Sequence, residues 1–279
     1  MHRIARIAIA ALASVGMLAS VAACGSGQST SEKNGTIEVA ASVNQWGTVA
    51  KALGGDNVNV TSIINSTNVD AHDYEPTTSD IAKLQKAQVI IVNGAGYDAW
   101  AVKAAQTANA TIINAAEVGG VNDGENPHVW FSADVRKAVA QAITEAYEQA
   151  DAAKKNDFDK MNDQWTAEEN NVESKIAEVK QKTDGLAYAA TESVASYLAE
   201  DMGLADATPS GYARATANES EPTPTDIKQF TDALKAGEIK LLVVNTQEES
   251  ELTGKITDAA KSVEVPMVEL TEQMPEQYD

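Results

Sequence analysis

The chain has 279 residues, enough for two domains of ordinary size, with a formal net charge of −20 and 43% hydrophobic residues. An acidic surface disfavours nucleic acid as a partner, because nucleic-acid binding relies on Lys and Arg side chains that neutralise phosphates. The single cysteine excludes disulfides within one chain, and no apolar run after residue 24 approaches the roughly 18–20 residues that span a bilayer.

The first 24 residues have the pattern of a secretion signal. Arg3 and Arg6 make a basic start, and a mostly apolar run follows them. Removing a signal that carries two Arg and no acid changes the formal charge from −20 to −22. We expect a signal peptide at 1–23, which is therefore left out of the fold prediction.

Cys24 closes the tetrapeptide Val-Ala-Ala-Cys, which resembles the lipobox of bacterial lipoproteins. That resemblance implies cleavage before Cys24 and a diacylglyceryl anchor on its sulfur. The alternative is an incidental thiol in a removed peptide. Small polar residues follow, so we expect a flexible tether at 24–35 and an extracytoplasmic protein held to the membrane by lipid.

Residues 36–150 predict an α/β lobe, because strand-like and helix-like stretches alternate. Strands separated by single helices imply parallel pairing with crossover connections. The expected strands are 36–42, 58–64, 88–92 and 111–114. The expected helices are 45–53, a stretch through 81–84, 97–108 and 133–150. Residues 77–80 offer N-cap candidates for the helix through 81–84.

Residues 151–182 contain no Gly and no Pro and predict one long helix. Apolar residues recur there at helical spacing, namely Phe158, Met161, Trp165, Val172, Ile176 and Val179. A helix of about 30 residues is roughly 45 Å long, which exceeds the width of a small domain. We therefore expect a rigid helix that joins two lobes, with Asp151 as its N-cap.

Residues 183–279 predict a second α/β lobe. The expected strands are 185–190, 240–245 and 265–270, the expected helices are 194–202, 226–234 and 250–262, and 207–216 is expected to be extended. The fold class is thus α/β, with two lobes that each contain a mainly parallel sheet, and with function expected in the cleft between them.

His72 and His128 are the only histidines outside the predicted signal, and both lie in loops after strands of the first lobe. A lone histidine in a loop is usually just a surface residue. Two such loops at one sheet edge favour a metal site, because neutral imidazole is the commonest nitrogen ligand for transition metals. Glu192 and Glu272 follow strands of the second lobe, but composition alone does not distinguish them from solvated acids.

Several motifs, in order, resemble the metal-binding subunits of bacterial zinc and manganese ABC importers from about Thr36 onwards. They are His72-Asp73-Tyr74-Glu75-Pro76 with Ser79-Asp80, Asn93-Gly94-Ala95-Gly96 with Trp100, Asn126-Pro127-His128-Val129-Trp130, Ser196-Tyr197-Leu198 before Gly203-Leu204, Glu221-Pro222, Asn245-Thr246-Gln247, and Thr271-Glu272 before Pro275. The second histidine motif is the most specific single match.

The resemblance implies a non-enzymatic substrate-binding lipoprotein, monomeric, that delivers one buried divalent cation to an ABC permease with its ATPase. It implies the ligands His72, His128, Glu192 and Glu272, two from each lobe. Two imidazoles and two carboxylates cancel the charge of M²⁺, and a neutral cluster is buried at far lower cost than a bare ion.

The cargo is expected to be Mn²⁺ or Zn²⁺. Many zinc-type members carry histidine where Glu192 stands, so the glutamate favours Mn²⁺, although raw affinity ranks Zn²⁺ higher. The histidine-rich loop of some zinc importers is absent between Glu117 and Pro127, and any metal-collecting role would fall to Asp123 and Glu125 or to no residue. The family usually continues with a C-terminal helix where this sequence stops at Asp279, so either the sequence is shortened or that helix is missing.

Three alternatives stay open at this point. One is a metal-dependent hydrolase that uses the same His and Glu residues, although such an enzyme keeps an open coordination position. Another is a surface adhesin on the same fold. A third is binding of a metal complex such as a siderophore, for which Tyr212 and Arg214 are the only aromatic and basic pair of the second lobe.

Overall fold

The computed structural model describes residues 35–275 and residue 278, so the predicted signal peptide, Cys24 and nearly all of the predicted tether lie outside the described residues. Among the described helices, none combines the length and the apolar character that crossing a membrane requires. Two separate four-stranded sheets, both entirely parallel, form the centres of two lobes. This confirms the predicted fold class.

The first lobe is built on the sheet with strand order β2-β1-β3-β4. All of β3 is buried: Val89 and Ile91 belong to one apolar cluster and Ile90 to another, because helices cover both faces. The elements are β1 (Ile37–Val43), α1 (Asn44–Gly54), η1 (Gly55–Asn57), β2 (Val58–Ile64), α2 (Thr78–Lys86), β3 (Val89–Val92), α3 (Ala99–Ala105), β4 (Thr111–Asn114), α4 (Ala115–Val118), η2 (Val129–Phe131) and α5 (Ala133–Ala150).

The second lobe is built on the sheet with strand order β6-β5-β7-β8. Its largest fully buried side chains are Tyr212 and Phe230, whose ring centroids lie 4.9 Å apart. The elements are β5 (Ala187–Ala190), η4 (Ser193–Ala195), α7 (Ser196–Asp201), β6 (Ala205–Asp206), α8 (Ser210–Ala217), α9 (Pro224–Lys235), β7 (Leu241–Asn245), α10 (Glu251–Ser262) and β8 (Met267–Leu270).

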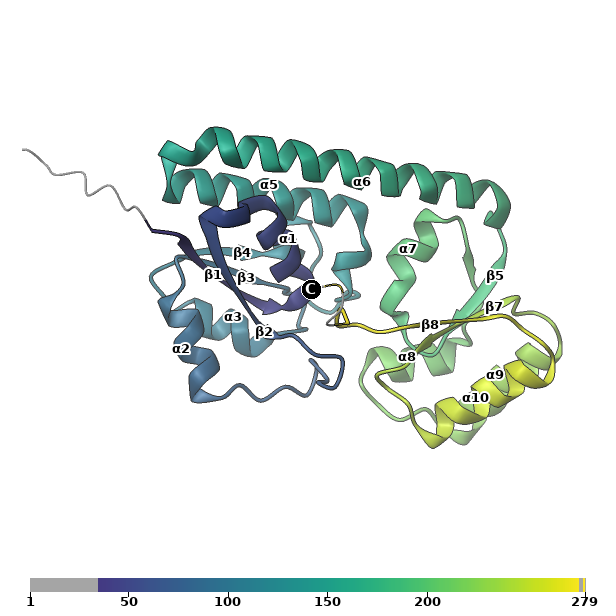
Figure 1. Cartoon of the computed structure of the whole chain (residues 1–279). Helices are drawn as coiled ribbons and strands as arrows, with labels where there is room; N and C mark the ends of the chain where they lie inside the picture. The colour runs from purple at the N-terminus through teal and green to yellow at the C-terminus, as the bar shows by residue number, and fades with distance from the viewer. Residues whose placement is uncertain (1–34, 276–277, 279) are drawn as a thin grey trace, which may run out of the picture. The chain divides into compact units, whose positions relative to one another are not determined.

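A single long helix runs past both lobes. α6 (Lys155–Thr183) has 29 residues, which corresponds to roughly 44 Å, and it contacts α1 and α5 of the first lobe and α7 of the second (Figure 1). It begins after the 3-10 turn η3 (Ala152–Lys154), and Asp151 caps that turn by accepting a hydrogen bond from the N–H of Ala153. The expected long helix is therefore present and starts four residues later than expected.

The inward face of α6 is less apolar than its sequence indicates. Phe158 and Ile176 are buried, whereas Val172 is 46% exposed. Glu169 is buried between them and is paired with Arg136 of α5, whose guanidinium also donates to the carbonyl of Trp130. A buried ion pair thus fixes this helix on α5 together with the apolar contacts.

Residues 207–216 were expected to be extended, and that prediction is wrong. They contain most of α8, which begins at Ser210. Tyr212 is 1% exposed and packs on Phe230, and the backbone at Gly211 lies so close to the Asp226 carboxylate that an added Cβ would be 2.0 Å from its Oδ1. These tertiary contacts with α9 override a weak local helix propensity.

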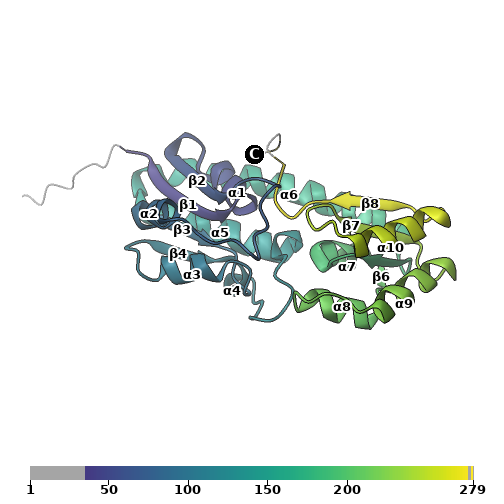
Figure 2. The ribbon, with the colours of Figure 1, turned by 90° about the horizontal axis from the view of Figure 1, so that it is seen from below.

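The chain returns to the first lobe after its last strand. Residues 271–275, here called the return segment, run from β8 back towards α1 (Figures 1 and 2). The amide of Asn44 donates to the carbonyl of Met274 at 2.7 Å and accepts from its N–H at 3.1 Å, and Gln45 Nε2 donates to the carbonyl of Glu272 at 2.6 Å. The two lobes are therefore joined by hydrogen bonds here as well as by α6.

Candidate metal centre

The four predicted ligand residues converge where the two lobes face each other. His72 lies in the loop between β2 and α2, and His128 immediately precedes η2. Glu192 follows β5, and Glu272 lies in the return segment after β8. In open α/β sheets, sites form beyond the carboxyl ends of the strands, and three of these four residues lie there directly.

Their donor atoms form one compact cluster. One ligand atom from each residue can be chosen so that all four lie within 4.8 Å of one another. His72 Nε2 lies 3.8 Å from Glu192 Oε1 and 3.6 Å from Glu272 Oε2, and His128 Nε2 lies 3.4 Å and 3.7 Å from the same oxygens. Four donors around a tetrahedral Zn²⁺ at about 2.0–2.1 Å are about 3.4 Å apart, so the spacing fits one small cation.

Each imidazole has its other ring nitrogen beside an oxygen acceptor. His128 Nδ1 lies 2.6 Å from Asn126 Oδ1, and His72 Nδ1 lies 3.2 Å from Glu219 Oε1. An acceptor at Nδ1 keeps the proton on that nitrogen and leaves Nε2 to ligate. Both Nε2 atoms are buried and have no hydrogen-bond partner among the described residues, as expected for nitrogens that bind a cation.

Each histidine is fixed by the backbone around it. The N–H of His72 donates to Asp70 Oδ1 at 2.8 Å, which closes a turn in an otherwise irregular loop. Asn93 is fully buried and donates to the carbonyl of Pro127 at 2.9 Å, next to His128, while Trp46 Nε1 donates to Asn93 Oδ1. The most specific motif in the sequence is therefore held against the core of the first lobe.

The two carboxylates are held by donors that the sequence analysis did not assign to the site. The Tyr97 hydroxyl donates to Glu272 Oε2 at 2.6 Å. Asn245 Nδ2 donates to Glu192 Oε2 at 2.5 Å and to Glu272 Oε1 at 2.8 Å. Burial and the Glu272 carboxylate raise the pKa of Tyr97 well above its ordinary value, so its hydroxyl stays a donor at neutral pH.

Electrostatics couple the buried pair His128 and Glu272. Burial lowers the pKa of His128, but the carboxylates of Glu192 and Glu272 outweigh it and raise that pKa to about 9. Burial likewise opposes ionisation of Glu272, and the facing imidazoles with the Tyr97 hydroxyl lower its pKa to about 2. In the metal-free chain these shifts favour a protonated His128 imidazole facing an ionised Glu272 carboxylate.

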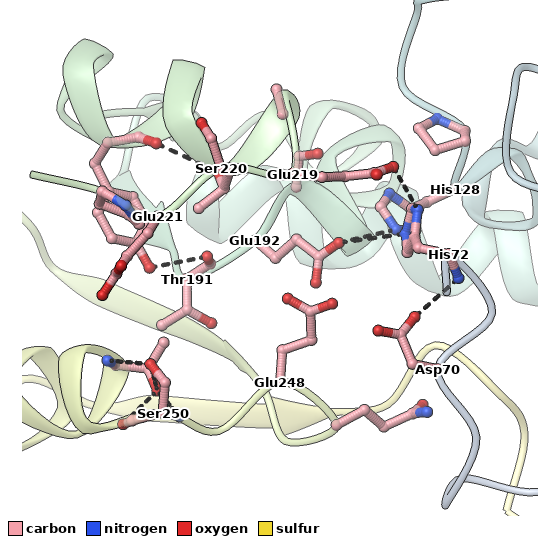
Figure 3. Close-up of a pocket in the computed structure, with 18 of the residues that line it drawn as sticks. Asp70, His72, His128, Thr191, Glu192, Glu219, Ser220, Glu221, Glu248 and Ser250 are labelled. Atoms are coloured by element: carbon pink, nitrogen blue, oxygen red, sulfur yellow. Dashed lines mark hydrogen bonds and ion pairs between the residues drawn. The ribbon is translucent and has the colours of Figure 1, made fainter. Parts of the chain in front are cut away.

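The cleft around the cluster has a volume of about 1030 Å³ and is strongly acidic. Figure 3 shows the carboxylates of Glu192 and Glu248 close together, with Asp70 and His72 nearby. Burial and the neighbouring charges of Glu192, Asp70 and Glu272 raise the pKa of Glu248 to about 7. Such a cleft attracts cations and repels anions.

The remaining predicted residues lie in different places. Glu125 lines the cleft, whereas Asp123 lines a smaller hollow beside α4. Tyr212 is buried and donates to the carbonyl of Thr191, and Arg214 is not among the described residues that line the cleft. The pair considered for siderophore binding therefore gives no wide basic or aromatic pocket.

Sequence reasoning missed Tyr97, Glu219 and the role of Asn245. Tyr97 follows the Asn-Gly-Ala-Gly turn at a distance from both acids in sequence, and Glu219 lies in a polar loop with no periodic signal. Asn245 was noted only as part of a family-like tripeptide. The one available signal was its position as the last residue of an apolar strand, where open α/β sheets place their functional groups.

A two-lobed α/β fold with a partly buried His₂Glu₂ cluster between the lobes, which could hold a cation, is typical of a solute-binding protein. Over residues 39–279 the chain matches the family described as "Zinc-uptake complex component A periplasmic". Because this match covers most of the chain, the protein belongs to that family of metal-importer substrate-binding proteins. Members are solute-binding proteins and not enzymes, which confirms that part of the sequence prediction.

Individual relatives are distant but similar in length. The chain is 24% identical over 245 residues to the manganese ABC transporter substrate-binding lipoprotein PsaA of Streptococcus anginosus, covering 80% of this chain and 77% of the relative. It is 26% identical over 236 residues to the iron ABC transporter substrate-binding lipoprotein MtsA of Streptococcus pyogenes serotype M1, covering 76% and 73%. The crystal structure of ZnuA superposes with a TM-score of 0.72 at 19% identity, covering 87% and 93%.

Proposed function

We propose that this protein captures one divalent transition metal ion, Zn²⁺ or Mn²⁺, between its lobes and delivers it to an ABC permease. His72 and His128 supply imidazole nitrogens, and Glu192 and Glu272 supply carboxylate oxygens. The relatives' names specify manganese and iron, and the family description specifies zinc, so the class of cargo is common to them while the metal differs. Substrate-binding proteins of this class work with a permease and its ATPase.

One observation carries the proposal. Four potential ligands that are up to 200 residues apart in sequence lie within 4.8 Å of one another, and both imidazoles direct an unpartnered buried nitrogen towards that cluster. Two carboxylates balance the charge of M²⁺, so the loaded cluster is neutral and suited to burial. Four protein donors leave little room for substrate at the metal, which argues against a hydrolase.

Calorimetry with ZnCl₂ and MnCl₂ tests this assignment. Binding should be lost in the double variant His72→Ala/His128→Ala and strongly weakened in Glu192→Gln and Glu272→Gln. Glu238→Gln is the matched control, because Glu238 is exposed and lies outside the cleft lining. Metal should also raise the melting temperature of the wild type by mass action and leave that of the double variant unchanged. Unaltered affinity in the double variant would refute the assignment.

The same proposal places the protein outside the cytoplasmic membrane as a lipid-anchored monomer. The support is the lipobox-like tetrapeptide that ends at Cys24 and the lipoprotein designation of the relatives. Mass spectrometry of the membrane fraction should find a diacylglyceryl group on the N-terminal cysteine, and Cys24→Ser should release the protein from membranes. Retention of that variant on the membrane would exclude the anchor.

A further inference from the structure

Asn245 touches both carboxylates of the donor cluster at once. It is the last residue of β7 and is only 2% exposed. Its Oδ1 accepts the backbone N–H of Gln247 at 3.0 Å. A peptide nitrogen can only donate, so this contact fixes the orientation of the amide and directs both Nδ2 hydrogens towards Glu192 and Glu272.

The amide occupies one oxygen of each acid. Asn245 Nδ2 binds Oε2 of Glu192 and Oε1 of Glu272, at 2.5 and 2.8 Å. The other oxygens, Glu192 Oε1 and Glu272 Oε2, are the ones that lie 3.4–3.8 Å from the imidazole nitrogens. The cluster therefore presents a cation with two nitrogens and two single oxygens, and the remaining oxygens are engaged elsewhere.

We propose that Asn245 is a positioning residue that determines metal specificity, by restricting each carboxylate to one-oxygen coordination and thereby favouring Zn²⁺ over Mn²⁺. This inference rests on the proposed function of the site. Zn²⁺ is satisfied by four N and O ligands in a tetrahedron, whereas Mn²⁺ belongs with the cations that take six oxygen-rich ligands in an octahedron. The further oxygens that Mn²⁺ requires are those that the amide holds.

The hydrogen bonds of Asn245 favour a different metal from the one that residue type alone favours. A glutamate at 192 favours Mn²⁺ when only its oxygen chemistry is considered. The preference changes when the hydrogen bond on its second oxygen is included, because the number of oxygens that a carboxylate can offer depends on its neighbours. Specificity then lies partly in a residue that does not ligate the metal.

The test compares the ratio of the Mn²⁺ and Zn²⁺ dissociation constants in three proteins, measured by competition with chelators. Asn245→Ala should lower this ratio at least about tenfold, because loss of such a hydrogen-bonding partner typically changes metal affinity 10- to 100-fold. Thr246→Val is the matched control: Thr246 is the next residue, and its hydroxyl bonds only to the carbonyl of Leu270 among the contacts described. It should leave the ratio unchanged.

X-ray absorption at the Zn and Mn edges gives a second measurement, the number of oxygen ligands on the metal. This number would not change if Asn245 had only a structural role. The wild type should show four-coordinate Zn²⁺ with both carboxylates bound through one oxygen, and Asn245→Ala should show an added oxygen ligand on Mn²⁺. Equal weakening of both metals with an unchanged ratio would overturn the proposal. So would a two-oxygen carboxylate in the wild-type zinc site, a measurement that needs no variant.

Two further comparisons distinguish a failure of the role of Asn245 from a failure of the proposed function. If Asn245→Ala does not fold by circular dichroism, Asn245→Ser, whose hydroxyl can serve only one acid, is expected to change the ratio in the same direction, and an unchanged ratio there overturns the proposal. If wild-type protein binds neither metal, the proposed function itself fails. If the wild type binds both metals and the ratio is insensitive to Asn245, only the role of Asn245 fails.

Discussion

Metal binding should release a proton from His128. In the metal-free chain the pKa of this imidazole is raised to about 9, so at pH 7 it is almost entirely protonated. A ligating imidazole must be neutral, and the metal therefore displaces that proton. Well below pH 9 the apparent affinity should rise about tenfold per pH unit from this group alone, and it should rise about 24-fold between pH 7 and pH 8.5.

The folding stability of the metal-free protein should depend on pH in the opposite direction to the metal affinity. The folded pKa of His128 lies above its ordinary value of 6.5, so protonation stabilises the folded chain by about 3 kcal/mol at pH values below 6.5. That contribution decreases as the pH rises through 9. Alkaline pH should thus destabilise the metal-free protein while it strengthens metal binding.

Two measurements check this reasoning. Calorimetry at pH 7.5 in buffers of different ionisation enthalpy should count about one proton released per metal from His128. Nuclear magnetic resonance of the metal-free mature chain, which is predicted to contain only two histidines, should show one imidazole titrating near pH 9, and His72→Ala assigns the signals. Glu192→Gln should lower that pKa, and Glu238→Gln should not. An ordinary pKa for His128, with no proton released, would refute the electrostatic account.

Three further predictions concern the metal preference of the site and the contacts that stabilise the fold around it. Glu192→His should shift preference towards Zn²⁺ in competition assays, because a third imidazole replaces a carboxylate oxygen; an unchanged preference would show that the donor type at 192 does not matter. Tyr97→Phe should cost about 1–3 kcal/mol of unfolding free energy in urea titrations, since Gln273 Nε2 donates to that hydroxyl at 2.8 Å and would be left buried without a partner. Glu169→Ala should cost about 3–5 kcal/mol by leaving Arg136 unpaired, whereas Asp232→Ala, which breaks an exposed pair with Lys228, should cost less than about 1 kcal/mol.

The sequence predicted the elements that depend on local pattern. The apolar run that forms β3 and the Gly- and Pro-free stretch that forms α6 carry strong periodic signals, and both are present. α8 was missed because its helix is specified by the packing of Tyr212 on Phe230, a contact between residues that local propensity does not report. Short β6 (Ala205–Asp206) likewise exists only through its pairing with β5.

The candidate ligands were predictable and their environment was not. His72 and His128 stood out because the chain has so few histidines, and motif resemblance added the two acids. The groups that set the chemistry of those ligands, Tyr97 and Asn245, gave no comparable signal. Their importance depends on which carboxylate oxygen each one touches, and that is a property of the folded backbone.

The arrangement also changes how the two lobes share the site. The sequence suggested a symmetric division, with two donors on each lobe. Glu272 follows a strand of the second lobe and accepts from Asn245 there, but its carbonyl is also held by Gln45 and its carboxylate by Tyr97 of the first lobe.

The two imidazoles of the first lobe and Glu272, which both lobes hold, together carry one negative charge when the imidazoles are neutral. With M²⁺ bound, that partial site has a net charge of +1. Glu192, on the second lobe, supplies the charge that neutralises the cluster. A buried uncompensated charge is costly, so contact with Glu192 should be strongly favoured once the cation is present and much less so without it. If the proposed ligands bind the metal, we therefore expect it to favour contact between the lobes chiefly through Glu192, and withdrawal of this carboxylate to expose the ion for release.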